Sequence, residues 1–131
     1  MYKLAFIILL FAVSSCQNIT SSYDFDLGEE FELRFGQQAS LDNGELKITF
    51  KEVLEDSRCP EGVTCVWAGN AQIFLIVNGS EATLNTYLEP QVRDISGYQI
   101  ELLSLNPYPV YQQTIEKETY IAKLVVNLNE K

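Results

Sequence analysis

The sequence predicts an all-β fold, an antiparallel β-sandwich or barrel of about six to seven strands that is stabilised by one disulfide. Short segments in which apolar and polar residues alternate, the pattern of half-buried strands, recur along the chain with turn residues between them. No long segment has the periodicity of an amphipathic helix. Many short strands joined by turns are typical of sandwiches and barrels.

The first two strands are predicted by strict alternation. Residues 31–35 alternate phenylalanine and leucine with charged residues, and a glycine follows. Asn43-Gly44 is typical of a hairpin turn. Residues 46–50 alternate in the same way, and we expect this strand to continue through Val53, where the apolar pair Val53-Leu54 indicates a bulge.

Residues 71–77 are almost entirely apolar, and we expect them to form the central strand, buried on both faces. Asn78-Gly79 supplies a second hairpin turn. The return strand is predicted over residues 81–88 and ends before Glu89-Pro90. A helix over residues 80–88 is the alternative, which the threonine, asparagine and tyrosine residues of this segment disfavour.

The C-terminal third predicts two further strands. Residues 98–105 alternate again. Residues 106–111 contain two prolines, which lack backbone donors and exclude an inner strand. A polar connection over residues 112–119 leads to the last strand, residues 120–128, in which apolar side chains alternate with polar ones.

The N-terminus carries the features of an export signal. Lys3 is followed by ten apolar residues, 4–13, a segment too short to span a bilayer as a helix. Val13-Ser14-Ser15-Cys16 then resembles a bacterial lipobox, in which the cysteine becomes the lipidated N-terminus. An ordinary signal peptide, or a short anchor with a chance cysteine, is the alternative.

The export signal divides the chain into three predicted parts. We expect residues 1–15 to be a lipoprotein signal peptide, residues 16–28 a lipidated polar tether, and residues 29–131 a single all-β domain. Lipid on Cys16 would anchor the protein to the membrane.

Cys59 and Cys65 are predicted to form a disulfide. Five residues separate them, whereas zinc sites usually place paired cysteines two to four residues apart. The chain also has no histidine and no C-x-x-C motif. Lipid on Cys16 and a bridge between the other two account for the odd number of cysteines, and export supplies the oxidising compartment that a disulfide needs.

The loop around this disulfide is the candidate interaction site. Cys59-Pro60-Glu61-Gly62 fits a type I turn, and closing the loop restricts the unfolded chain by about 2–2.5 kcal/mol. Either the bridge only holds the entry of a strand, or it presents a rigid loop to a partner. The candidate partner-binding residues on and near the loop are Arg58, Glu61, Trp67 and Tyr108.

Each of these candidates also has a structural interpretation. Trp67 follows the disulfide by two residues and is typical of core packing over it. Arg58 is close to Asp56 in sequence, which favours a local ion pair worth under about 1 kcal/mol when exposed. Tyr108 and Tyr111 either stack on a sugar or peptide or pack over one end of the fold.

The composition argues against several functions. Without histidine there is no His-dependent catalysis, and no glycine-rich phosphate loop is present. The formal charge of −9, from 18 acidic and 9 basic residues, disfavours nucleic acid as a partner. Glu55, Asp56 and Glu61 do not have the spacing of an EF-hand. We predict a protein that is not an enzyme and uses no cofactor or metal; a hydrolase whose carboxylates the fold brings together is the alternative.

A motif surrounds the predicted disulfide. It consists of Ser57-Arg58-Cys59-Pro60 followed by Val63, Cys65, Trp67, Gly69 and Ala71. This motif resembles one in small bacterial lipoproteins and secreted proteins of unknown function, and residues 102–109 and 120–124 are also similar to the C-terminal part of these proteins. The resemblance covers roughly residues 46–128. It implies an exported β-rich domain and transfers no activity.

These observations predict a lipid-anchored accessory protein of the bacterial cell envelope that faces the periplasm or the exterior. We expect it to bind an envelope protein or a ligand through its loops. There are two alternatives. One is a protease inhibitor that presents Arg58 on the disulfide-bonded loop, and the other is a purely structural envelope lipoprotein.

Overall fold

The computed structural model describes residues 22–41 and 44–130. These residues form the strands β1 (Ser22–Phe25), β2 (Glu30–Arg34), β3 (Gln38–Leu41), β4 (Lys47–Asp56), β5 (Ala71–Val77), β6 (Ser80–Asn85), β7 (Val92–Ile95), β8 (Tyr98–Asn106) and β9 (Ile121–Leu128). One short 3-10 helix, η1 (Lys117–Thr119), precedes β9. The described chain is almost entirely β, which confirms the predicted fold class.

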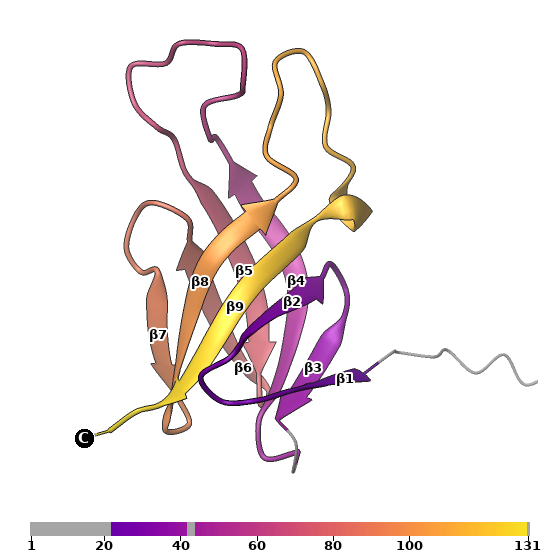
Figure 1. Ribbon diagram of the computed structural model, residues 1–131, viewed down its shortest axis with the longest axis vertical. Coiled ribbons are helices and arrows are strands. Elements are labelled where there is room, and N and C mark those ends of the chain that lie inside the picture. Colours follow the sequence, from indigo (N-terminus) through magenta and orange to yellow (C-terminus); the bar gives the residue numbers. More distant parts are fainter. Residues whose placement is uncertain (1–21, 42–43, 131) are drawn as a thin grey trace, which may run out of the picture.

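The strands form two sheets that pack face to face as a sandwich (Figure 1). The larger sheet has the strand order β1-β3-β4-β5-β6, and the smaller one has the order β2-β9-β8-β7. All strand pairs are antiparallel except β1 and β3, which pair in parallel. This exception arises because β2, which lies between them in the sequence, belongs to the other sheet.

Strand β1 lies inside the segment 16–28 that the sequence predicts to be a tether, so that prediction is wrong for Ser22–Phe25. Phe25 is buried and stacks on Phe31 with the ring centroids 4.3 Å apart. Burial of this one large aromatic ring favours docking of a strand of only four residues. Residues 1–21, with Cys16 and the predicted signal peptide, lie outside the described residues.

Strands β1, β3 and β7 were not predicted, and they raise the number of strands from the expected six or seven to nine within the described ranges. Each has only four residues. A segment this short contains too few positions for a period of two to be recognised.

Strand β5 is buried on one face only. Its residues Ala71, Ile73, Leu75 and Val77 are fully buried, whereas the side chains between them are partly exposed. The prediction of burial on both faces is wrong because a sandwich has two layers, so the outer face of each sheet meets solvent. Strand β6 also ends earlier than predicted, at Asn85, whose backbone N–H donates to Pro90 O at 2.9 Å.

The predicted hairpin turn at Asn78-Gly79 joins β5 to β6, which excludes the alternative of a helix in this segment. Both turn residues have positive φ angles, 48° and 81°, as a type I′ turn requires. The predicted bulge in β4 is also confirmed, because the pairing with β5 shifts its register between Val53 and Glu55.

One apolar core fills the space between the two sheets. Its largest fully buried side chains come from both layers and include Leu33, Phe50, Ile73, Ile100 and Leu124. The inward side chains alternate with outward ones along each strand, as strand geometry requires. The core therefore holds β4, β5, β8 and β9 firmly, and the loops that leave these strands start from fixed points.

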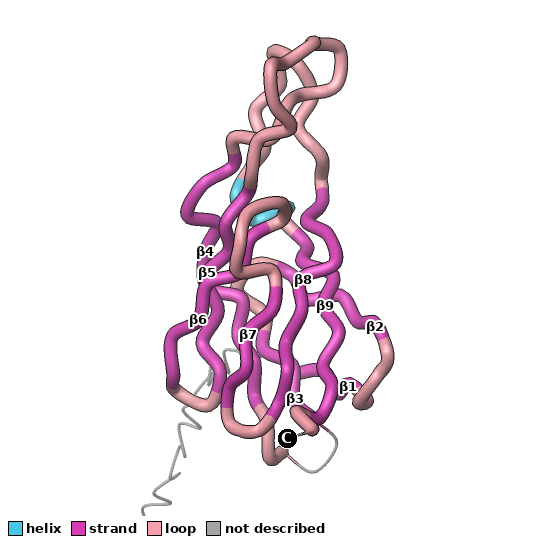
Figure 2. Tube along the Cα trace, turned by 90° about the vertical axis from the view of Figure 1, so that its left-hand side faces the viewer, coloured by secondary structure: helices cyan, strands magenta, loops and turns pink. Residues whose placement is uncertain are grey.

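Two long loops project from the same end of the sandwich (Figures 1 and 2). Loop 57–70 joins β4 to β5, and loop 107–120, which contains η1, joins β8 to β9. Strand β1 and the C-terminal end of the described chain lie away from these loops (Figure 1). Among the residues that the structure describes, no helix is long and apolar enough to cross a membrane.

Candidate functional site

The candidate site is the loop end, which we define as loop 57–70, loop 107–120 and the connection 86–91 between β6 and β7. All four candidate residues from the sequence lie in the first two of these segments. The structure assigns them different positions, however: Glu61, Trp67 and Tyr108 are exposed, and Arg58 is buried.

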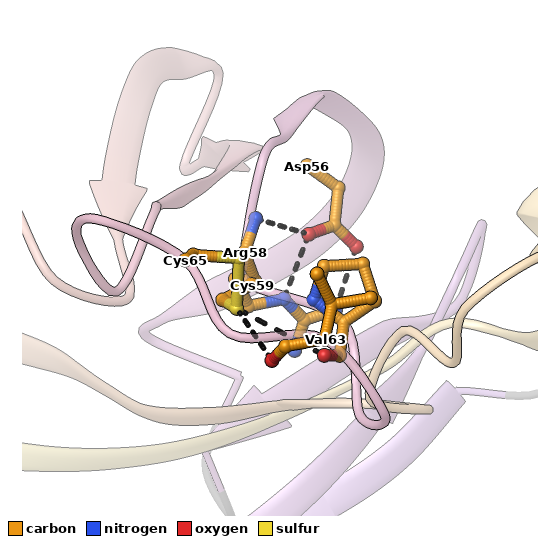
Figure 3. The surroundings of a disulfide bond; sticks show 6 residues. Asp56, Arg58, Cys59, Val63 and Cys65 are labelled. Carbon is orange, nitrogen blue, oxygen red and sulfur yellow. Dashed lines mark hydrogen bonds and ion pairs between the residues drawn. A yellow bond between two sulfur atoms is a disulfide. The ribbon is translucent and has the colours of Figure 1, made fainter.

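The predicted disulfide between Cys59 and Cys65 is confirmed (Figure 3). It closes residues 59–65 of loop 57–70 into a ring, with the two Cα atoms 5.9 Å apart. The carbonyl oxygen of Val63 lies 3.5 Å from Cys59 Sγ, inside the ring. The cross-link restricts the conformations that the ring can adopt, in the folded and the unfolded chain alike.

Arg58 is buried, with 7% of its surface exposed, and this burial disfavours the partner contact that the sequence suggested. Its Nε and Nη2 atoms donate to the two carboxylate oxygens of Asp56 at 2.7 and 2.6 Å (Figure 3). Nη1 donates to Leu105 O at 2.6 Å, and Nη2 also donates to Pro107 O at 3.0 Å. A guanidinium suits this position because its planar fork carries several donors at once.

This arrangement makes Arg58 a clamp between the two long loops. It lies on loop 57–70, while both carbonyls that it binds belong to the end of β8 and the start of loop 107–120. A protease inhibitor of the type considered above requires this arginine to be exposed. Its burial removes the observation on which that alternative rested.

Asp56 is the second centre of the clamp. Its Oδ2 also accepts a hydrogen bond from the Tyr120 hydroxyl at 2.8 Å, which ties the other end of loop 107–120 to β4. Burial alone would raise the pKa of Asp56, but the hydrogen bonds from Arg58 and Tyr120 and the charge of Arg58 hold this pKa below its usual value. Burial and the hydrogen bond to Asp56 raise the pKa of Tyr120 to about 12.

Backbone hydrogen bonds join the two loops further out. The Glu61 N–H donates to Pro109 O at 2.9 Å, and the Tyr111 N–H donates to Glu61 O at 3.0 Å. These bonds form an isolated parallel bridge between Glu61 and Val110. The Glu61 side chain, in contrast, is exposed, and it stays a candidate for partner contact.

The two ends of loop 57–70 approach each other closely, next to β4 and β5. Ser57 N–H donates to Asn70 O at 2.7 Å, and Cys59 N–H donates to Ala68 O at 2.9 Å. A Cβ atom at Gly69 would overlap the Ser57 carbonyl oxygen and lie 2.7 Å from Arg58 Cα. Gly69 also has a φ angle of 75°, so both the space and the backbone conformation require glycine.

Asn70 connects the base of this loop to connection 86–91. Its side chain is buried, and Nδ2 donates to Asn85 Oδ1 at 2.9 Å. Its Oδ1 accepts from the N–H groups of Tyr87 and Leu88 at 3.1 and 3.2 Å. We did not predict this role for Asn70 from the sequence; the available signal was a Gly-Asn pair directly before a buried strand.

Exposed apolar side chains gather where loop 57–70 and connection 86–91 meet. We call Val66, Trp67, Tyr87 and Leu88 the tip patch. Val66 is fully exposed, and Trp67 and Tyr87 are 49% and 58% exposed. The rings of Trp67 and Tyr87 meet edge to face, with their centroids 6.4 Å apart. The interpretation of Trp67 as core packing over the disulfide is therefore wrong.

Tyr108 and Tyr111 lie on the other loop and are also partly exposed. The Arg58 guanidinium carbon lies 4.9 Å from the centroid of the Tyr108 ring, a cation–π distance. One face of Tyr108 thus covers the clamp, which agrees with the structural interpretation. Tyr111 has no such role and is the more exposed of the two.

Acidic residues outnumber basic ones at the loop end, where the basic residues are Arg58 and Lys117. Lys117 pairs with Glu52 of β4 at 3.2 Å. The Arg58 charge is buried against Asp56, while Glu61, Glu89 and Glu116 are exposed. Among the described residues, no three acidic, histidine or cysteine side chains come together as a group that would hold a metal ion.

No protein-family model, curated protein or solved structure matches this chain. A clamp, a disulfide and a buried asparagine hold the loops in one arrangement, and this arrangement presents exposed apolar and acidic side chains.

Proposed function

We propose that this protein is a lipid-anchored accessory protein of the bacterial cell envelope that binds a partner through its loop end. The observation that carries the proposal is the tip patch, four exposed apolar side chains on a cross-linked frame. Large apolar side chains, tryptophan and tyrosine above all, supply most of the binding energy at protein interfaces. Exposed clusters of such residues mark interaction sites.

The rigidity of the loops supports a binding role. A loop that is ordered only on binding loses conformational entropy at that moment, at about 0.5–1.5 kcal/mol for each immobilised side chain. Here the Arg58 clamp, the bridge at Glu61 and the Cys59–Cys65 bond order the loops in advance. More of the contact energy is then available for affinity.

The lipobox-like sequence at Cys16 supports the anchor. Five residues separate Cys16 from β1 in the sequence, and five extended residues reach at most about 18 Å. Because β1 lies away from the loop end (Figure 1), an anchor at Cys16 would leave the tip patch pointing away from the bilayer. The net charge of −9 also disfavours contact with anionic headgroups.

The anchor is tested by the intact mass of protein extracted from membranes. We expect a lipid adduct on Cys16 of a chain that lacks residues 1–15, and no adduct on Cys16→Ala protein. Cys59 and Cys65 should resist alkylation until they are reduced. An unlipidated mass, or the same adduct on Cys16→Ala protein, would contradict the anchor.

Binding is tested by replacing Val66 with the photo-crosslinking residue benzoylphenylalanine in cells that make the protein. The matched control places the same residue at Glu32, which is exposed on β2. We expect an adduct from position 66 and none from position 32. We also expect Trp67→Ala to lower the yield from position 66 while the protein still unfolds in one cooperative transition, which shows that it is folded.

Two results would overturn this proposal. The first is equal cross-linking from positions 66 and 32, which would show that the tip patch has no special role. The second is turnover by the purified chain on a panel of hydrolase substrates that is lost on mutation of a carboxylate, because we propose binding and no catalytic step.

A further inference from the structure

We propose that the tip patch inserts into an apolar pocket on a different envelope protein, and that lysine or arginine side chains line the rim of that pocket. The inference rests on the proposed function and names the chemistry of the partner. Three features of the described residues lead to it: the shape of the loop end, its charge and the way its cation is buried.

The shape indicates that the partner supplies the concave surface. Loop 57–70 extends well beyond the sandwich (Figure 2). Val66, which directly follows Cys65 of the disulfide ring, is fully exposed, and Trp67 comes next. A projecting apolar side chain loses its contact with water only when it enters a pocket, because a flat surface covers one side of it.

The charge indicates what surrounds that pocket. Glu61 follows Cys59 by two residues in the disulfide ring, and Glu89 directly follows Leu88 of the tip patch. Both side chains are exposed, and within residues 22–41 and 44–130 neither takes part in an ion pair. Interfaces place opposite charges across from each other, and like charges at the rim are repulsive.

The same charges disfavour two other binding partners, which are a second copy of this chain and an anionic bilayer. A second copy of this chain would bring its own acidic rim against Glu61 and Glu89, and each copy carries a net charge of −9. An anionic bilayer would repel the loop end for the same reason. With a basic rim on another protein, both the apolar side chains and the charged side chains of this surface favour binding.

The experiment uses the full chain with its anchor and the photo-crosslinking residue at position 66. Glu61→Lys and Glu89→Lys are introduced separately and together. The matched control is Glu81→Lys, which changes the charge by the same amount on β6 near the opposite end of the sandwich. Unchanged unfolding curves show that each variant is folded.

We expect the double reversal to lower the yield of the adduct about tenfold, and Glu81→Lys to leave it unchanged. The protein identified in the adduct is then purified and titrated with the full chain. Its association rate should fall as salt rises, and this salt dependence should weaken in the double reversal.

The other outcomes overturn the inference in distinguishable ways. An adduct with another protein that is insensitive to the reversals refutes the basic rim and leaves the proposed function intact. Adducts with a second copy of this chain, or with lipid, refute the assigned partner. Absence of any adduct from position 66 removes the proposed function together with the inference.

Discussion

Arg58 provides the most direct test of how the loop end is built. Replacing it with alanine removes the cation that faces Asp56 and the donors to Leu105 O and Pro107 O. Asp56 would keep only the Tyr120 hydroxyl as a side-chain partner. Because these groups are at most partly reached by water, the loss is not compensated by solvent as it is at an open surface.

The expected magnitude follows from the burial of the ion pair. Its two side chains are 6% and 11% exposed. Removing one partner of a buried pair typically costs 3–5 kcal/mol, whereas an exposed pair contributes about 1 kcal/mol or less. We expect a loss of about 3–5 kcal/mol for Arg58→Ala. Arg58→Lys should cost less, because lysine keeps the charge but has no fork to bind both Asp56 oxygens and both carbonyls.

Equilibrium unfolding in urea at neutral pH measures this loss. The control is Lys117→Ala, which breaks the exposed pair between Lys117 of loop 107–120 and Glu52 of β4. That variant should lose less than about 1 kcal/mol. Equal losses for Arg58→Ala and Lys117→Ala would refute the clamp, since Arg58 would then behave as an exposed residue.

Acid provides a second readout for the same pair. Because the pKa of Asp56 is held below its usual value of 3.8, its contribution is fully present above about pH 4 and is lost as the pH falls through the folded-state pKa. The difference in stability between the wild type and Asp56→Asn should therefore be constant near neutrality and shrink in acid. A difference that does not change with pH would contradict the ion pair.

Three further predictions concern the frame of the loop end. Gly69→Ala should lower the free energy of unfolding by about 1–3 kcal/mol more than Gly79→Ala, because Gly79 has a similar positive φ but open space around it. Equal losses for the two variants would refute the close approach of Gly69 to Ser57 and Arg58. Replacing both Cys59 and Cys65 with serine should lower the free energy of unfolding by about 2–2.5 kcal/mol, and an unchanged value in urea would contradict the role of the bridge. The pKa of Tyr120 is raised from 10 to about 12, so the contribution of this hydroxyl to stability is present below pH 10 and is lost as the pH rises to 12. Over this range the wild type should lose stability that the Tyr120→Phe variant does not lose. Parallel pH profiles of the two proteins would exclude the hydrogen bond to Asp56.

The fold class was predictable because its signals are local. Alternation with a period of two predicted β2, β4, β8 and β9 from neighbouring residues alone. The turn at Asn78-Gly79 and the bulge near Val53 were each predicted from two adjacent residues. The short strands β1, β3 and β7 were missed because each depends on pairing with a distant strand and has too few residues for a pattern.

The sequence predicted the position of the candidate site in the chain but not the role of each residue in it. Cysteine spacing located the disulfide and the loop that carries it, because few other uses of two such cysteines were compatible with a chain that lacks histidine. The assignment of roles within the loop failed for two residues. Arg58 was expected at the surface and is buried, and Trp67 was expected, in its structural interpretation, over the disulfide and is exposed.

The all-β class, the hairpin, the bulge and the Cys59–Cys65 bond could be predicted from the sequence, since each of these depends on residues close together in the chain. The role of Arg58 depends on the packing of distant segments. Its carbonyl partners lie 47 and 49 residues away, and Tyr120 lies 64 residues from Asp56. Whether a charged side chain is solvated or buried depends on which distant groups satisfy it, and the packing of the two sheets brings those groups together.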